Sequence, residues 1–184
     1  MKTFLSLFML IASFNLFAAE NPTVVMETSK GQIIIELFPD EAPKTVANFL
    51  AYVQKDGYKK TTFHRVINGF MIQGGGFSAK TGNKVSTLPP VENESRNGLS
   101  NERGTLAMAR TANPHSASRQ FFINHKDNAF LDAKGGNWGY TVFGEVTLGM
   151  DVVDKIAKVK TASQDKPVQP VIINSIKLLD REMK

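Results

Sequence analysis

Apolar residues alternate with polar residues over several short stretches of the chain, a pattern typical of β-strands with one buried face. In the stretch GQIIIEL, residues 31–37, the aliphatic side chains at positions 33, 35 and 37 fall on one face of an extended chain. A second apolar run precedes it, and Ser29-Lys30-Gly31 between the two runs predicts a β-hairpin. Six further strands are predicted at 61–67, 70–73, 105–109, 120–124, 140–146 and 171–179.

Two segments carry the longer apolar period of an α-helix. Val46, Leu50 and Val53 recur at i, i+4 and i+7, which places them in one stripe on a helix, and Pro43 suits the first helical position. A second short helix is predicted at 150–158. About eight strands with two helices indicate a mainly β fold, a closed eight-stranded antiparallel barrel capped by two α-helices.

The connection from Gly74 to Gly104 is long and rich in Gly, Pro, Asn and Ser. A connection of this length in a compact domain is usually functional or wrapped over the surface. It contains Asn93-Glu94-Ser95, which matches the N-glycosylation acceptor pattern, but a motif this short often arises by chance.

Composition narrows the class of protein. The 184 residues suffice for one domain with its own core, and 42% hydrophobic and 21% charged residues are a normal globular balance. The net charge of +5 is mild and no block of five like charges occurs, which argues against a nucleic-acid-binding arm. The chain has no cysteine, which excludes disulfides, thiol chemistry and a lipoprotein anchor.

The first 18 residues have the layout of a secretory signal peptide, with Lys2, an apolar run from Phe4 to Phe17 and then small residues. The run has 14 residues, whereas a membrane-spanning helix needs about 20. We expect cleavage after Ala18, because cleavage after Ala19 would place bulky Phe17 at a specificity position. The sequence predicts a signal peptide at 1–18, one domain at 19–184 and a periplasmic location, with release from the cell or an uncleaved anchor as alternatives.

Several familiar chemistries are excluded. Residues 76–84 faintly resemble a phosphate-binding loop, but the glycine spacing is wrong and Asn83 stands where lysine is required. No G-x-S-x-G motif is present. The three histidines, His64, His115 and His125, have no zinc-ligand spacing.

Arg65 stands alone among apolar, aromatic and glycine residues in the stretch FHRVINGFMIQGGG. Arginine is rarely buried unless it is paired, so this one either points to water from a strand edge or lies at the mouth of an apolar pocket. Strand alternation puts Met71 with Gln73, and Gln120 with Phe122, on shared faces. If the opposite faces fill the barrel, these side chains make an outward patch that is unusually apolar. Any one of these apolar residues is better explained as part of the core. Taken together with Arg65 and the two glutamines, they predict an apolar pocket rimmed by hydrogen-bonding groups.

Four motifs carry a family resemblance: TTFHRVINGFMIQGGGF, GTLAMAR, QFFINHKDNAFLD and GYTVFGEV. They resemble, in order, motifs of the cyclophilins, which are peptidyl-prolyl cis-trans isomerases. The similarity runs from about Thr23 to Leu179 and is greatest to the bacterial periplasmic branch. It implies the same capped barrel that the periodicity predicts.

The resemblance also implies roles for individual residues. Arg65 corresponds to the family's catalytic arginine, and Gln73 to the residue that orients it and contacts the substrate carbonyl. Arg110 is expected to contact the substrate mainly through its backbone, and His64 to be structural. The implied substrate-binding residues are Phe70, Met71, Phe122 and Leu131 around the proline ring, Ala109, Arg110 and Gln120 along the preceding residues, and Phe130 and Tyr140 beside them.

Four positions depart from the family pattern. Asn68 stands where proline is common, and Tyr140 where many eukaryotic members have histidine. Arg119 replaces a small residue; by alternation it shares a face with Phe121, so it lies near the groove edge only if the strand end twists. Phe130 stands where eukaryotic members carry tryptophan, and the loss of the indole N–H predicts weak binding of cyclosporin-type macrocycles.

The predicted function is isomerisation of X-Pro bonds in exported proteins during folding. No metal or organic cofactor is needed, because no covalent bond changes. The expected partners are unfolded or partly folded exported proteins that contain proline. Nucleic acid and stable membrane insertion are not expected, and the chain is expected to be a monomer. The alternatives are a non-catalytic chaperone module that binds proline segments in the cell envelope and, more weakly, an adhesion protein; the combination of Arg65, Gln73 and Phe122 favours the enzyme.

Overall fold

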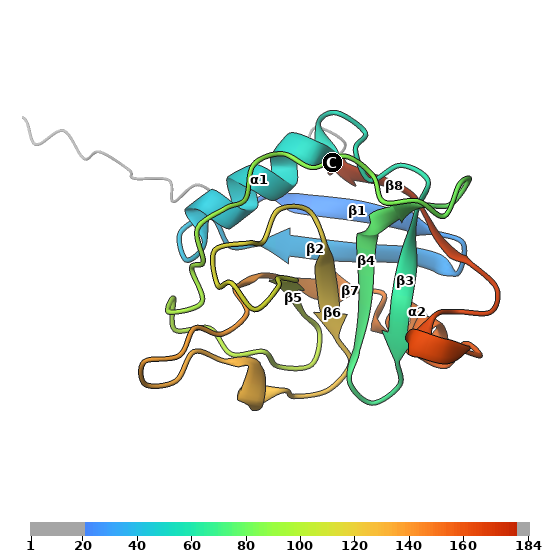
Figure 1. Cartoon of the computed structure of the whole chain (residues 1–184). Helices are drawn as coiled ribbons and strands as arrows, with labels where there is room; N and C mark the ends of the chain where they lie inside the picture. Colours follow the sequence, from blue (N-terminus) through green and yellow to red (C-terminus); the bar gives the residue numbers. More distant parts are fainter. Residues whose placement is uncertain (1–20, 180–184) are drawn as a thin grey trace, which may run out of the picture.

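The computed structural model describes residues 21–179. Within them, eight strands close into an antiparallel barrel in the order β1-β2-β7-β5-β6-β4-β3-β8 (Figure 1), which confirms the predicted fold class. The predicted signal peptide, residues 1–18, lies outside the described residues. The strands are β1 Thr23–Thr28, β2 Gly31–Leu37, β3 Thr61–Ile67, β4 Met71–Ser78, β5 Thr105–Met108, β6 Phe121–Asn124, β7 Val142–Leu148 and β8 Val171–Leu178.

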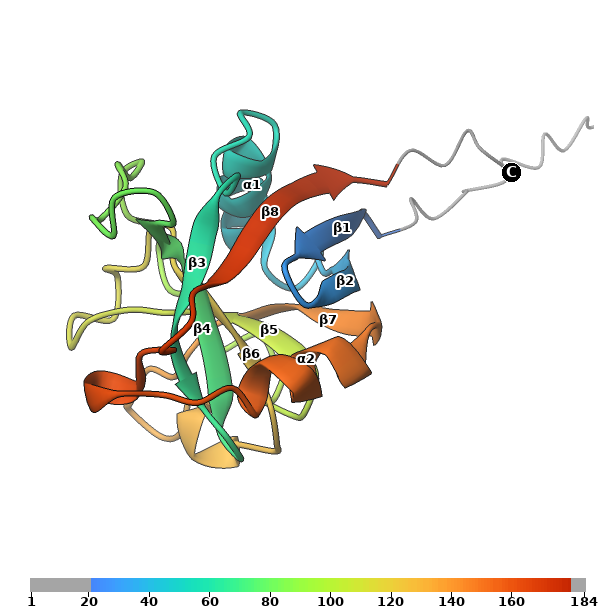
Figure 2. The same ribbon diagram turned by 90° about the vertical axis from the view of Figure 1, so that its right-hand side faces the viewer.

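Two α-helices, α1 (Pro43–Val53) and α2 (Met150–Ala157), lie at opposite ends of the barrel (Figure 2). As predicted, α1 begins at Pro43. Two single-turn 3₁₀ helices, η1 (Ala129–Leu131) and η2 (Ser163–Asp165), lie in the loops after β6 and after α2.

Two strands differ clearly from their predicted limits. β4 continues through its glycine run because it keeps pairing with β3 as far as Ser78, which lies opposite Thr61. β7 starts later than predicted because the N–H of Tyr140 donates to the carbonyl of Leu131 (2.8 Å), outside the sheet. It then runs on to Leu148 beside β2, because tertiary pairing overrides the local pattern.

Aromatic rings fill the barrel interior. Phe49 of α1 packs against Phe121 and Phe143, with ring centroids 5.8 and 5.3 Å apart, and against Tyr58 at 5.1 Å. All four rings are almost completely buried. Aromatic contacts of this kind dominate the energy of a core, so α1 closes its end of the barrel by inserting one ring.

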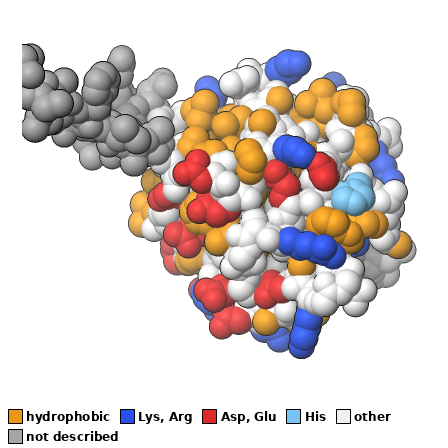
Figure 3. Space-filling model, turned by 90° about the vertical axis from the view of Figure 1, so that its left-hand side faces the viewer, with side chains coloured by type: hydrophobic (Ala, Val, Ile, Leu, Met, Phe, Trp, Pro, Cys, Tyr) orange, Lys and Arg blue, Asp and Glu red, His pale blue; other side chains and the backbone are white. Residues whose placement is uncertain are grey.

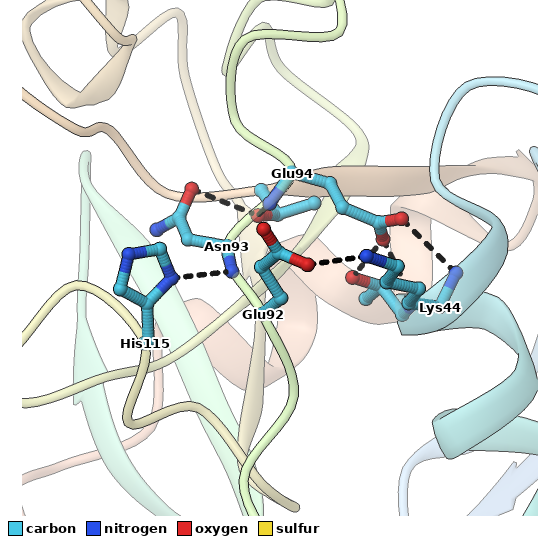
Figure 4. Close-up of polar contacts among 7 residues, drawn as sticks. Lys44, Glu92, Asn93, Glu94 and His115 are labelled. Atoms are coloured by element: carbon cyan, nitrogen blue, oxygen red, sulfur yellow. Dashed lines mark hydrogen bonds and ion pairs between the residues drawn. The ribbon is translucent and has the colours of Figure 1, made fainter.

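The long connection between β4 and β5 is pinned to the barrel by buried polar groups. The Asn93 amide donates to the carbonyls of Pro114 and Gly139, both at 3.1 Å, and its side chain is only 6% exposed. The Asn93 backbone N–H donates to Nδ1 of His115 at 3.1 Å (Figure 4). The Asn93 side chain is therefore occupied in the fold and is not available as a glycosylation acceptor.

Arg119 pins the same connection from inside. Arg119 is 4% exposed. Its guanidinium donates to the backbone carbonyls of Gly75 (2.7 Å), Ser86 (2.9 Å) and Gly57. It also lies over the ring of Tyr52, 4.7 Å from the centroid. Arg119 thus lies on the inward face that alternation predicts, and it is not at the groove edge.

Candidate active site

Arg65 reaches the outer surface of the barrel because β3 contains a bulge. Phe63 lies opposite Gly74 and Arg65 lies opposite Gln73, so β3 holds one residue, His64, more than β4 between these pairs. Strict alternation would turn Arg65 to the same inward face as Phe63. The bulge reverses the order: Phe63 is 1% exposed, whereas the Arg65 side chain is 45% exposed.

The pairing register aligns the predicted site residues across neighbouring strands. Gln73 of β4 lies opposite Phe122 of β6, which in turn lies opposite Ala107 of β5, so a row runs from Arg65 across four strands. Because cross-strand partners share a face, this row covers the outside of the barrel. Phe122 and Ala107 of this row belong, with Met71 and Val142, to a small apolar cluster that is separate from the interior core.

A pocket of about 120 Å³ opens on this outer face. The Phe122 ring lines it and meets the Tyr140 ring edge-on, with centroids 5.7 Å apart. Leu131 reaches it from η1. Nine of the predicted site residues line the pocket: Arg65, Phe70, Met71, Gln73, Ala109, Arg110, Phe122, Leu131 and Tyr140.

The two other predicted residues lie next to this pocket. Gln120 accepts a 2.9 Å hydrogen bond at Oε1 from Nε2 of Gln73. The Gln120 side chain lies across Gly76, where an added Cβ would come within 2.5 Å of it, so a side chain at position 76 would displace Gln120. Phe130 is 73% exposed and stacks on Phe70, with centroids 5.7 Å apart and planes 22° from parallel.

The turn that leads into Phe70 is fixed from outside the pocket. Gly69 donates its N–H to Nδ1 of His125 (3.0 Å), and Nε2 of that ring contacts Asp154 of α2 at 2.8 Å. The Phe70 carbonyl accepts two hydrogen bonds, one from the backbone N–H of His125 and one from the side-chain amide of Asn128, both at 2.9 Å. These supporting residues were not found from the sequence, because nothing in their local pattern ties them to Phe70.

Arg110 lines the pocket, and each of its three guanidinium nitrogens donates to the protein. Its guanidinium donates to the backbone carbonyls of Gly139 (3.0 Å), Thr111 (2.9 Å) and Trp138 (2.8 Å). It also lies 4.6 Å from the centroid of the Tyr140 ring. The side chain of Arg110 is therefore engaged by the protein.

Arg65 has a different environment. Its Nε lies 3.3 Å from Oδ2 of Asp165 in η2, and within the described residues its two Nη groups have no hydrogen-bond partner. A second pocket of about 560 Å³ lies on the side of Arg65 toward η2, and Asp165 lines it. Sequence reasoning missed Asp165, because 100 residues separate it from Arg65 and no motif joins them.

His64, the bulged residue, is a neutral ring at pH 7. Burial lowers its pKa to about 4, against weaker opposing effects of nearby hydrogen-bonding groups. The ring packs against Phe77 with centroids 4.5 Å apart. This environment is consistent with the structural role expected for His64.

Comparisons with known proteins show the family of the chain. The family model described as cyclophilin type peptidyl-prolyl cis-trans isomerase matches residues 23–178. The chain is 60% identical to the peptidyl-prolyl cis-trans isomerase cyp18 of Streptomyces antibioticus, covering 85% of this chain and 98% of the relative. It is 55% identical to peptidyl-prolyl cis-trans isomerase B of Escherichia coli strain K12, covering 83% of this chain and 97% of the relative. A crystal structure of a cyclophilin type isomerase from Cryptosporidium parvum matches with a TM-score of 0.77 at 30% identity, covering 86% and 98%.

Sequence and fold thus define the class of the domain, a capped barrel with its pocket on the outer face. The chain belongs to the cyclophilin-type peptidyl-prolyl cis-trans isomerase family, and its activity is the cis–trans isomerisation of X-Pro bonds. Among the described residues, no helix is long and apolar enough to cross a membrane.

Proposed function

We propose that the X-Pro bond of the substrate rotates in the pocket beside Arg65. One observation carries this proposal: among the described residues that line this apolar pocket, Arg65 is the arginine whose two Nη groups have no protein partner, since every guanidinium nitrogen of Arg110 donates to a backbone carbonyl. In this proposal Arg65 and Gln73 are the catalytic residues, and the proline ring rests on Phe122.

The chemistry requires a donor of this kind. A peptide bond resists rotation by about 18–20 kcal/mol because the nitrogen shares its lone pair with the carbonyl. When the bond twists, the prolyl nitrogen regains its lone pair and becomes a hydrogen-bond acceptor. A guanidinium is always charged and carries several donors in a fixed plane. Arg65 therefore stabilises the twisted state more than either planar isomer, which is the condition for catalysis.

The pocket keeps one side of the bond still while the other rotates. Met71 and Phe122 hold the ring by apolar contact, and the Gln73–Gln120 hydrogen bond fixes the amide that faces the substrate carbonyl. Each tenfold gain in rate requires about 1.36 kcal/mol. A charge-assisted hydrogen bond in a partly dry site, together with orientation, supplies several such steps.

We also infer that the substrates are proline-containing exported proteins during folding, and that the chain acts as a periplasmic monomer. The layout of residues 1–18 supports export, and the lack of cysteine suits a domain that folds without disulfides. The face in Figure 3 intersperses acidic, basic and apolar side chains, so no field of one sign covers it. A mixed face of this kind suits varied unfolded chains better than nucleic acid.

The test of the site compares wild type with Arg65→Ala in an isomerisation assay on a short X-Pro peptide. We expect kcat/KM to fall by at least about 100-fold, or about 2.7 kcal/mol, with the fold intact by circular dichroism. Arg96→Ala is the matched control, because Arg96 is an exposed arginine over Trp138, outside the pocket. A folded Arg65→Ala variant with activity within a few-fold of wild type would refute the proposal.

Export has its own test. Intact-mass measurement on protein from the cell envelope should give a chain that begins at Ala19 or Glu20. A mass that includes residues 1–17 would show that the segment is retained as an anchor.

A further inference from the structure

We propose that Asp165 is a positioning residue for Arg65. The proposal rests on the role assigned to Arg65 above. Asp165 Oδ2 contacts Arg65 at Nε, 3.3 Å away, and at neither of the two Nη groups. Because the guanidinium is planar and rigid, a partner at Nε restricts the orientation of the whole plane while the outer N–H groups stay available to the substrate.

The backbone around Asp165 is built to present this carboxylate. Gln164 and Asp165 both adopt left-handed conformations, with φ of 60° and 59°. Such conformations are unfavourable for residues with a side chain, and they persist where the surroundings enforce them. Aspartate tolerates this region better than most residues with a side chain, so the strain lies mainly at Gln164, the residue before the one that meets Arg65.

The loop is closed at its base, beneath Gln164 and Asp165. The N–H of Ala162 donates to the carbonyl of Lys166 (2.8 Å), and the N–H of Val168 donates to the carbonyl of Lys160 (2.9 Å). Thr161 and Pro167 form an isolated bridge between the same two arms, and Pro167 is buried. A loop tied at its base in this way holds Asp165 against β3, on the side of Arg65 that faces the larger pocket.

This geometry makes a specific kinetic prediction. An arginine side chain has large rotamer freedom, and without Asp165 the plane of Arg65 samples more orientations. The hydrogen bond from Arg65 to the prolyl nitrogen forms only in the twisted state. Poorer orientation of Arg65 should therefore lower kcat and leave KM nearly unchanged. We expect Asp165→Asn, which keeps the shape and removes the charge, to lower kcat about fivefold with KM nearly unchanged.

Salt separates positioning from a merely structural role. Ion pairs with exposed side chains are screened by salt, so the wild-type kcat should approach that of Asp165→Asn as sodium chloride rises to 1 M, while the variant should change little. Asp151→Asn is the control, because Asp151 forms an even more exposed ion pair with Lys155 (2.8 Å) on α2, away from the pocket. It should leave kcat and its salt dependence as in wild type.

Three results are informative. If Asp165→Asn keeps the kcat and the salt dependence of wild type while Arg65→Ala is inactive, the positioning role is overturned and the proposed site stands. A fall in kcat that comes with a lower unfolding temperature and an unaltered salt dependence would also overturn it, because Asp165 would then only hold the loop. An active Arg65→Ala variant would refute the proposed site itself.

Discussion

The carboxylate of Glu94 caps helix α1 from a loop 49 residues away. Its Oε2 accepts hydrogen bonds from the backbone N–H and the hydroxyl of Thr45, at 2.8 and 2.7 Å, and its Oε1 accepts from the N–H of Lys44 at 3.0 Å (Figure 4). The residue at the helix N-cap, Ala42, has no side-chain acceptor to offer. Glu94 thus satisfies the N–H groups that every helix leaves open at its start, and it fastens the long connection to the barrel.

Removing this cap should destabilise the protein without affecting the pocket. We expect Glu94→Ala to lower the free energy of unfolding by about 1–2 kcal/mol, because the N–H and hydroxyl of buried Thr45 lose their acceptor. In a chain of this size the unfolding temperature should fall by roughly 2–8 °C. Glu92→Ala is the control, since within residues 21–179 Glu92 pairs only with the exposed end of Lys44 and should change the unfolding temperature little. Equal effects of the two substitutions would contradict the capping role.

Arg119 should be among the most costly residues to remove. Arg119→Ser leaves a cavity and three backbone carbonyls without donors, so we expect a loss of about 3 kcal/mol or more in urea unfolding. Arg119→Lys should also destabilise, because one ammonium cannot reproduce the fork of donors. Arg96→Ser, at an exposed arginine, serves as control. Stability close to wild type in Arg119→Ser would mean that the buried guanidinium contributes nothing net.

His64 should make stability depend on pH. At pH 7 the ring is mostly neutral in both states, so its effect on stability is small. As the pH falls below 6.5 the unfolded chain binds a proton that the folded chain does not bind until about pH 4. Stability should therefore fall between pH 6.5 and 4, by up to about 3 kcal/mol from this group. Urea unfolding at pH 7, 5 and 4 should show a shallower fall in His64→Gln, and parallel curves for the two proteins would disprove the assignment.

Phe130 should control the binding of cyclosporin-type macrocycles. It is 73% exposed and stacked on Phe70 beside the pocket. Phe130→Trp adds an N–H donor, worth roughly 0.5–1.5 kcal/mol, and a similar gain from apolar area. Inhibition should therefore tighten on the order of tenfold to a hundredfold. Turnover of short X-Pro peptides, measured alongside, should change much less, and unchanged inhibition would place Phe130 away from the bound macrocycle.

Local pattern was enough for much of the architecture. Alternation identified the buried face of 31–37, where positions 33, 35 and 37 are fully buried, and Pro43 marked the start of α1. These features depend on the period of the backbone and on the chemistry of single residues, which neighbours in sequence reveal. The motif resemblance added the residues around Arg65, which the sheet register then brought to one pocket.

Tertiary structure alone decided how Arg65 is presented. By alternation Arg65 shares the inward face of Phe63, and only pairing with β4 shows that His64 is an extra residue that turns the guanidinium outward. Asp165 meets Arg65 across 100 residues. Register and long-range contacts of this kind are set by the closure of the whole barrel, and a strand read by itself carries no information about how many residues its neighbour places opposite.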